Sequence, residues 1–228
     1  MISTTNNEVA ALEQIAAALA HEVKNPLTLA KARLDLLESS DERIDNKKSY
    51  NLIRKELNKI NDIMLDFINI MQTPDEENFD FVYLSDIIYS LAERYKEIYE
   101  SRINFTVDVE NTEVVILGNE KNIQILFNNI IKNALEAIEK DGQIFLSVRT
   151  NQANGSIIAT VRDTGKGIPK DLENKIHENY FTTKKFGSGL GLSICKKIAQ
   201  DHKGKFEISN NDDLGCIAKV VFPTYSSV

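Results

Sequence analysis

The sequence predicts an α+β protein in which an N-terminal helical hairpin precedes an α/β sandwich, and three observations support this fold class. Apolar residues recur at spacings of three and four through the N-terminal third, which is typical of amphipathic helices. Residues 72–78 are polar and contain a proline, as expected of a linker. From Phe79 onward, strand-like and helix-like segments follow one another, which indicates a mixed sheet covered by helices. We therefore expect a first domain over residues 1–72, a linker over 73–78 and a second domain over 79–228.

Two apolar stripes predict the two helices of the hairpin, and the polar residues 39–42 separate them. A single hairpin would leave part of its apolar surface exposed, and pairing with a second copy as a four-helix bundle would cover that surface. We therefore expect a homodimer. The first stripe comprises Leu12, Ala16, Leu19, Val23, Leu27, Ala30, Leu34 and Leu37, and the second comprises Ile53, Leu57, Ile60, Met64, Phe67 and Met71.

The second domain is expected to contain seven strands and three helices. Ser85 is a candidate N-cap for the first of these helices, and Asn154-Gly155 predicts a hairpin turn. The expected strands are 79–84, 103–109, 113–117, 143–150, 156–162, 205–209 and 216–222, and the expected helices are 85–100, 119–139 and 188–202.

Composition excludes several classes of protein. The chain has 228 residues and is 42% hydrophobic, which is enough for a packed core rather than a disordered chain. Its 34 acidic residues outnumber its 27 Lys and Arg, and no long basic run occurs, so a nucleic-acid partner is not expected. No stretch of about 18 apolar residues and no signal peptide is visible, so we expect no membrane segment and a cytoplasmic location. With no obvious sensing module, the chain is either a short cytosolic protein or part of a longer one.

The two cysteines and two of the three histidines are expected to be structural. Cys195 and Cys216 have no metal-binding or redox spacing, so they are predicted to be packing residues. His177 falls in a polar segment. His202 falls at the end of a helix, where a positive charge would favour the helix dipole.

His21 is the best candidate for a reactive side chain. At about 100° per residue it lies roughly 165° from the centre of the first apolar stripe, so it faces solvent. Glu22 is adjacent, Asn25 lies one turn on along the same face, and Pro26 can bend the helix. A neutral imidazole beside a carboxylate is a good phosphate acceptor near pH 7. Alone, an exposed histidine more often has no role, and a zinc site is disfavoured because Asn25 stands where HExxH requires histidine.

Two asparagines, Asn129 and Asn133, lie four apart on one face of the expected helix 119–139. An amide oxygen is a hard, uncharged ligand that suits Mg²⁺ already surrounded by phosphate oxygens. Such a pair is common on exposed helices, so it is weak evidence alone. Leu126, Ile130, Ala134 and Ile138 form the buried face of this helix and are expected to be core residues.

Two glycine-rich segments point to a ligand. Asp163-Thr164-Gly165-Lys166-Gly167-Ile168-Pro169 directly follows a strand, and its carboxylate could accept a hydrogen bond from the amino group of adenine; an ordinary turn is equally compatible. Gly187-Ser188-Gly189-Leu190-Gly191-Leu192 opens a helix, which suits phosphate by geometry and dipole. It is not a dinucleotide fingerprint, because Leu192 stands where the last glycine would be, and no P-loop pattern occurs.

Together these motifs resemble those of the sensor histidine kinases of two-component systems. Residues 21–28 (His-Glu-Val-Lys-Asn-Pro-Leu-Thr) resemble the H-box, and the segments at 129–134, 163–169 and 187–192 resemble the N, G1 and G2 boxes. Tyr180-Phe181-Thr182-Thr183-Lys184 resembles the F-box of the lid over ATP. The resemblance covers nearly the whole chain, and it is strongest to the sporulation and nitrogen-regulation type.

The resemblance implies roles for individual residues. His21 would be the phosphoacceptor and Glu22 its base, while Asn25 would orient water in the reverse, phosphatase reaction. ATP and Mg²⁺ would be bound in a sandwich of the gyrase and histidine-kinase type, with Asn133 as metal ligand and Asp163 reading adenine. The phosphoryl group would pass to an aspartate on a response-regulator receiver domain. Lys184 and Lys185 would contact phosphates or remain solvated. The implied nucleotide-binding residues are Asn129, Lys132, Asn133, Asp163, Gly165, Gly167, Ile168, Phe181, Thr182, Thr183, Lys184, Gly187, Ser188, Gly189, Leu190, Gly191 and Leu192.

Related ATP-binding folds offer rival functions. Gyrase-type ATPases, heat-shock chaperones and anti-sigma serine kinases share the fold, but they typically place a glutamate base where Asn129 stands, so the amide favours transfer over hydrolysis. A scaffold that no longer binds ATP is disfavoured by the intact glycine segments. Two positions depart from the family pattern: Glu136 replaces a basic residue, and Gly215-Cys216 replaces Gly-Thr.

Overall fold

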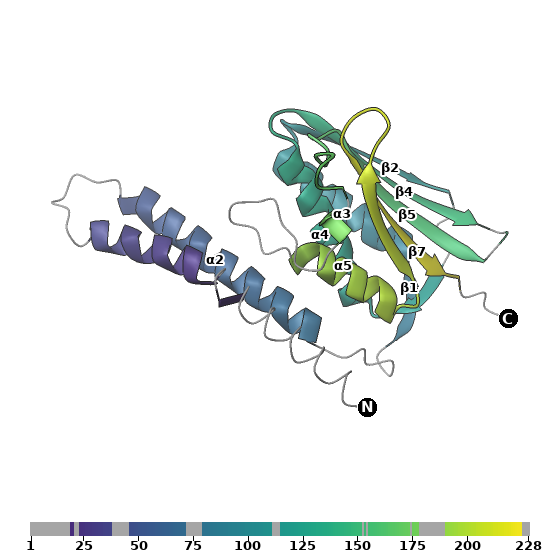
Figure 1. The fold of residues 1–228 in the computed structure, drawn as a ribbon, viewed down its shortest axis with the longest axis horizontal. Coiled ribbons are helices and arrows are strands. Elements are labelled where there is room, and N and C mark those ends of the chain that lie inside the picture. The colour runs from purple at the N-terminus through teal and green to yellow at the C-terminus, as the bar shows by residue number, and fades with distance from the viewer. Residues whose placement is uncertain are drawn as a thin grey trace. The chain divides into compact units, whose positions relative to one another are not determined.

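The computed structural model describes residues 19–20, 23–37, 46–71, 79–110, 115–151, 153, 155–173, 175–177 and 190–224 (Figure 1). The chain divides into two compact units, which are described separately: residues 1–72 with 178–190, and residues 73–177 with 191–228. The first is helical and the second is an α/β sandwich, so the predicted fold class is confirmed. Within the described part of the chain, none of the helices has the length and apolar character that crossing a membrane requires.

The helical unit contains residues 19–20 and 23–37 and the helix α2 (Asn46–Met71). Ala30, Ile53 and Ile63 are buried within one chain. By contrast Leu27 is 54% exposed and Leu34 is 43% exposed, although both belong to the predicted first stripe. The inward face of one hairpin is therefore narrower than the apolar surface it carries.

The predicted second stripe is divided between buried and exposed positions in one chain. Among the α2 side chains that the structure describes, Ser49, Ile53 and Ile63 are buried, whereas Leu57 and Met64 are exposed. The exposed members are part of the apolar surface that a single hairpin is expected to leave uncovered.

The second unit is built around a five-stranded sheet in the order β2-β4-β5-β7-β6, with a separate antiparallel pair β1-β3. Only β2 and β4 are parallel neighbours, and the other pairs are antiparallel. The strands are β1 (Asp80–Tyr83), β2 (Ile103–Val109), β3 (Val115–Gly118), β4 (Gly142–Asn151), β5 (Ser156–Asp163), β6 (Lys205–Asn210) and β7 (Cys216–Pro223), and the helices are α3 (Leu84–Tyr99), α4 (Glu120–Ala137), the short η2 (Lys175–His177) and α5 (Leu190–Asp201).

One face of the sheet forms the core. Burial alternates along β4, β5 and β7, so every second side chain points inward. Helices α3 and α4 pack against this face, and α5 lies on the same side (Figure 1). The inward row includes Ile144, Leu146, Val148, Ile157, Ala159, Val161, Ala218, Val220 and Phe222, and α4 meets it with Ile123, Leu126, Phe127, Ile130 and Ile131.

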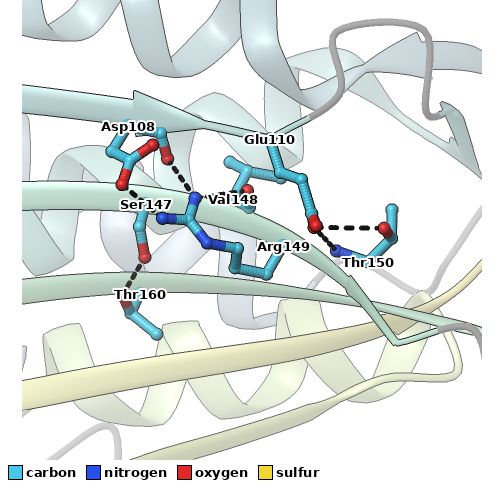
Figure 2. Close-up of polar contacts among 7 residues, drawn as sticks. All are labelled: Asp108, Glu110, Ser147, Val148, Arg149, Thr150 and Thr160. Carbon is cyan, nitrogen blue, oxygen red and sulfur yellow. Dashed lines mark hydrogen bonds and ion pairs between the residues drawn. The ribbon is translucent and has the colours of Figure 1, made fainter.

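The opposite face is held together by polar cross-strand pairs (Figure 2). The Ser147 and Thr160 hydroxyls lie 2.6 Å apart across β4 and β5. Arg149 forms an ion pair with Asp108 of β2 and donates to the Asp108 carbonyl at 2.8 Å. Polar pairs of this kind keep the uncovered face compatible with water and fix the strand register.

Two predicted helix starts can be compared with the structure. The predicted cap at Ser85 is wrong: α3 begins at Leu84 after Tyr83, and Ser85 is buried with its hydroxyl 3.2 Å from Asp86 Oδ1. Asn119 caps α4, since its Oδ1 accepts from the Asn122 N–H at 3.1 Å. This bond satisfies one of the donors that a helix leaves free at its start.

His202 is buried and structural, as expected, but not as a cation facing a helix dipole. Its Nδ1 lies 2.7 Å from the Ile198 carbonyl, its Nε2 accepts from the Asn119 N–H at 3.0 Å, and its ring stacks on Phe79 at 4.8 Å between centroids. Burial lowers the pKa of His202, which favours the neutral ring. The ring therefore joins the end of α5 to the start of α4.

Candidate nucleotide site

Helix α4 places Asn129 and Asn133 beside the beginning of α5. Both asparagines are half-buried, at the edge of the face that packs on the sheet. A Cβ at Gly191 would lie 3.2 Å from Asn129 Oδ1 and 3.9 Å from Asn133 Nδ2. Asn129 also donates to the Ile125 carbonyl at 3.0 Å. Glycine at position 191 thus lets the start of α5 approach the two amides closely.

Asp163 ends β5 and is only 5% exposed. Its Oδ1 accepts from the Gly165 N–H at 2.7 Å and from the Cys216 N–H at 3.3 Å. Burial raises the pKa of the Asp163 carboxyl, and the two N–H groups oppose that effect. Within the described residues Oδ2 has no hydrogen-bond partner, so it remains available to a ligand.

The loop after Asp163 is fixed by main-chain contacts. Thr164 and Gln143 exchange two hydrogen bonds, of 3.2 Å and 2.9 Å. The Lys166 N–H donates to the Ala137 carbonyl at 3.1 Å, and a Cβ at Gly165 would lie 2.6 Å from that of Ala137. The loop therefore lies directly on the end of α4, the helix that carries both asparagines.

These elements enclose a pocket with apolar walls and two polar groups, Asp163 and Asn133. Apolar walls with a single carboxylate are the kind of environment that would suit a heteroaromatic ring bearing an amino group. The Cys216 thiol also lines it, and burial raises the pKa of this thiol to about 12, so it is neutral at pH 7. The apolar walls come from Ile130, Ala134, Ala137, Val161, Leu192, Phe206, Ile208 and Ala218.

The sequence did not single out the strand residues of this pocket. Phe206 and Ile208 of β6 and Val161 of β5 were predicted only as strand positions. Their alternation marks them as inward-facing, but every inward residue of the sheet shows the same signal. The strand order, which the sequence does not reveal, places β6 beside β7 and brings Phe206 and Ile208 to the same pocket as Val161 of β5.

Some of the other predicted site residues lie in the described part of the chain, and others lie outside it. Lys132 is exposed on α4, Gly167 has a positive φ of 71°, Ile168 is half-exposed and Leu190 is the first residue of α5. Asn25 is half-buried on the helix 23–37 of the other unit. No group of three or more His, Cys, Asp or Glu that could hold a metal is present among the described residues. The predicted residues His21, Glu22, Phe181, Thr182, Thr183, Lys184, Gly187, Ser188 and Gly189 lie outside the described residues.

Comparisons with known proteins match both units. Residues 118–226 match the family described as "Histidine kinase-, DNA gyrase B-, and HSP90-like ATPase", and residues 11–72 match "His Kinase A (phospho-acceptor) domain". Sporulation kinase A of Bacillus subtilis (strain 168) is 28% identical over 215 residues, covering 92% of this chain and 34% of that protein. The chain spans 52% of sporulation kinase C of the same organism, so these relatives are about two to three times longer.

Some solved structures resemble part of the chain, and others resemble nearly all of it. The catalytic domain of histidine kinase ThkA is 30% identical with a TM-score of 0.55, covering 64% of this chain and 95% of that one. The structure of ThkA in complex with response regulator protein TrrA has a TM-score of 0.76 at 25% identity, covering 96% of this chain and 64% of that one.

Proposed function

Because the chain belongs to the sensor histidine kinase family, we propose that it transfers the γ-phosphoryl group of ATP to His21 and then to an aspartate of a response-regulator receiver domain. The observation that carries this proposal is Asp163, a buried carboxylate with one oxygen available at an apolar pocket. It lies in the same unit as the two asparagines beside Gly191.

The adenine ring occupies the apolar pocket, and its amino group donates to Asp163 Oδ2. The phosphates then extend toward Gly191 and the helix start, where main-chain N–H groups and the helix dipole favour negative charge. Asn133 supplies an uncharged oxygen ligand of the kind that Mg²⁺ accepts alongside phosphate oxygens. When bound, Mg²⁺ neutralises charge on the transferring group. Asn129 is an amide and cannot act as a base toward water, which supports transfer over hydrolysis.

The phosphoryl transfer itself is an in-line displacement. A ring nitrogen of His21 attacks the γ-phosphorus, the bond from that phosphorus to the bridging oxygen breaks, and ADP leaves. Glu22 accepts the proton that the imidazole releases. Catalysis rests mainly on positioning and charge neutralisation. In the second step the receiver aspartate takes the phosphoryl group from the imidazole.

The protein acts as a homodimer, with residues 1–72 as the dimerisation and phosphoacceptor domain and residues 79–228 as the ATP-binding domain. Leu27, Leu34, Leu57 and Met64 support this, because all four are large apolar side chains exposed on one hairpin. We place the reaction in the cytoplasm, where ATP is available and both cysteines stay reduced. Light scattering should give twice the mass of one chain, and a monomeric mass at micromolar concentration would contradict the dimer.

Labelling of the wild-type chain with γ-labelled ATP and Mg²⁺ tests the proposed activity. We expect one labelled position whose label is lost in acid and stable in base, as for a phosphoramidate. His21→Gln should abolish labelling and keep ATP affinity, because His21 belongs to the helical unit and the pocket to the other. Labelling that persists in His21→Gln would refute the phosphoacceptor assignment.

A further inference from the structure

We infer that Asn210 is a positioning residue of the nucleotide site: its side-chain amide holds the loop 165–169 in place through both main-chain groups of Ile168. The inference rests on the proposed ATP site at Asp163. Asn210 is the last residue of β6, more than 40 positions away in the sequence from the loop it contacts.

The contact uses every polar group of the amide. Asn210 Oδ1 accepts from the Ile168 N–H at 2.7 Å, and Nδ2 donates to the Ile168 carbonyl at 2.8 Å and to Glu173 Oε1 at 2.7 Å. The side chain thus pairs with Ile168 as the main chain of a neighbouring strand would. The Glu173 carboxylate fixes the orientation of the amide, because a flipped amide would point its oxygen at a carboxylate.

Asn210 holds the loop at Ile168, beyond the part that Thr164 and Lys166 hold. Thr164 and Lys166 are bound to β4 and to α4. In the described part of the chain, the bonds to Asn210 are the only hydrogen bonds of the Ile168 main chain. A loop fixed at one end alone would lose its shape next to Asp163.

Asn210 ends the strand that contributes Phe206 and Ile208 to the pocket. It shares one face of β6 with these two residues, because alternate residues of a strand point the same way. Its main chain pairs with Cys216, whose N–H donates to Asp163. Asn210 therefore connects the strand of the pocket wall, the loop and the partner of the proposed adenine-binding carboxylate.

Gly167 leaves room for the contact between Asn210 and Ile168. It has a φ of 71°, and a Cβ there would lie 2.9 Å from Asn210 Oδ1. Glycine at this position serves the close approach of the asparagine as well as the turn. The surrounding loop thus accepts the amide of Asn210 without a competing side chain.

Nucleotide affinity in Asn210→Ala, measured by calorimetry with ADP and with GDP, tests the inference. We expect ADP affinity to fall about threefold to tenfold, and the preference for ADP over GDP to shrink, because the loop no longer holds its shape beside Asp163. A residue that only stabilised the fold would lower the melting temperature and leave that preference unchanged in folded protein. Asn211→Ala is the matched control, since among the described residues Asn211 Nδ2 donates only to the Leu214 carbonyl, at 3.3 Å in the adjacent turn.

A variant that adds a negative charge at position 210 tests which atoms of the side chain donate and which accept. Asn210→Asp keeps the acceptor for the Ile168 N–H but turns a carboxylate toward the Ile168 carbonyl and Glu173, so it should weaken ADP binding more than Asn210→Ala. Adding Glu173→Gln supplies a donor to that carboxylate and should recover part of the loss. An Asn210→Ala variant with wild-type affinity and preference, or no recovery in the double variant, would overturn the inference. Wild-type protein that fails to bind ADP would instead refute the proposed function.

Discussion

Gly215 lies with its α-carbon directly against the main chain of Asp163. A Cβ at position 215 would overlap the Asp163 carbonyl oxygen and would lie 2.6 Å from Oδ1. Gly215 also has a φ of 80°, which favours glycine. The turn between β6 and β7 therefore depends on glycine both for its conformation and for the position of the carboxylate.

Gly215→Ala should consequently weaken ATP binding by roughly tenfold or more, because Asp163 must move to admit the methyl group. Gly155→Ala is the matched control: Gly155 also has a positive φ of 57°, but its Cβ would meet only Thr224 Oγ1 at 3.4 Å. Both variants should lose stability, and only Gly215→Ala should lose affinity in calorimetry. Equal affinity in the two variants would show that Asp163 does not depend on Gly215.

Asp163→Asn should weaken ATP binding by about tenfold to a hundredfold, since a charge-assisted hydrogen bond is worth roughly 1.5–3 kcal/mol. Asn133→Ala should instead impair Mg²⁺-dependent turnover and leave most of the affinity for metal-free nucleotide. Calorimetry with and without Mg²⁺ separates the two effects. Unchanged affinity in Asp163→Asn would contradict the adenine assignment.

The variant Asp163→Asn should be more stable than the wild type when no nucleotide is bound. Because the pKa of Asp163 is raised in the folded protein, the fold is more stable when this carboxyl is protonated. This stabilisation is fully present below the unfolded pKa of about 3.9 and is lost as pH rises through the folded pKa. Asparagine retains an acceptor for Gly165 and Cys216 without the buried charge. Urea unfolding from pH 4 to 8 should show an advantage for Asp163→Asn that grows with pH and then levels off.

His202 should make the fold sensitive to acid. Burial lowers the pKa of His202 and outweighs the opposing effects of the Ile198 carbonyl and Asp201. The contribution of His202 to the stability of the fold is therefore present above the unfolded pKa of about 6.5 and is lost as pH falls through the folded pKa. His202→Leu should cost about 1–3 kcal/mol at pH 7.5, because the Asn119 N–H loses its acceptor. The deficit should shrink toward pH 5, and a deficit independent of pH would show that the ring does not titrate.

We propose that the protein also dephosphorylates its regulator, and Asn25→Ala should separate this activity from autophosphorylation. Autophosphorylation requires His21, Glu22 and ATP, whereas dephosphorylating a regulator requires a water that an amide can orient. We expect the autokinase rate to stay within a few-fold and the phosphatase rate to fall by about tenfold or more. If Asn25 instead satisfies the main-chain group freed by Pro26, both rates and the helicity seen by circular dichroism should fall together.

Periodicity predicted the elements of the fold well, because each depends on its own residues. The expected strand 103–109 agrees with β2 at both ends, and α4 begins after Asn119, which serves as its cap. The error at Ser85 arises because distant residues decide its role. Ser85 is buried by tertiary packing instead of capping a helix.

The site divides in the same way. Asp163, Asn129, Asn133 and Gly191 could be selected because local motifs carry them. Asn210 could not, because a single asparagine at a strand end is unremarkable until strand order brings it to Ile168. Cavity-lining residues such as Phe206 likewise read as ordinary core.

The strand order also determines when the site can form during synthesis. β7 is the last strand in the described part of the chain, yet in the sheet it lies between β5 and β6. Until residues 216–223 have left the ribosome, Asp163 cannot accept the hydrogen bond from the Cys216 N–H. Strand β6 likewise has no neighbouring strand to pair with before that point. Helices of the hairpin make contacts that are local in sequence and can fold earlier. A chain stalled before residue 216 would carry the proposed phosphoacceptor helix but would lack Cys216 and Ala218, which line the candidate nucleotide pocket.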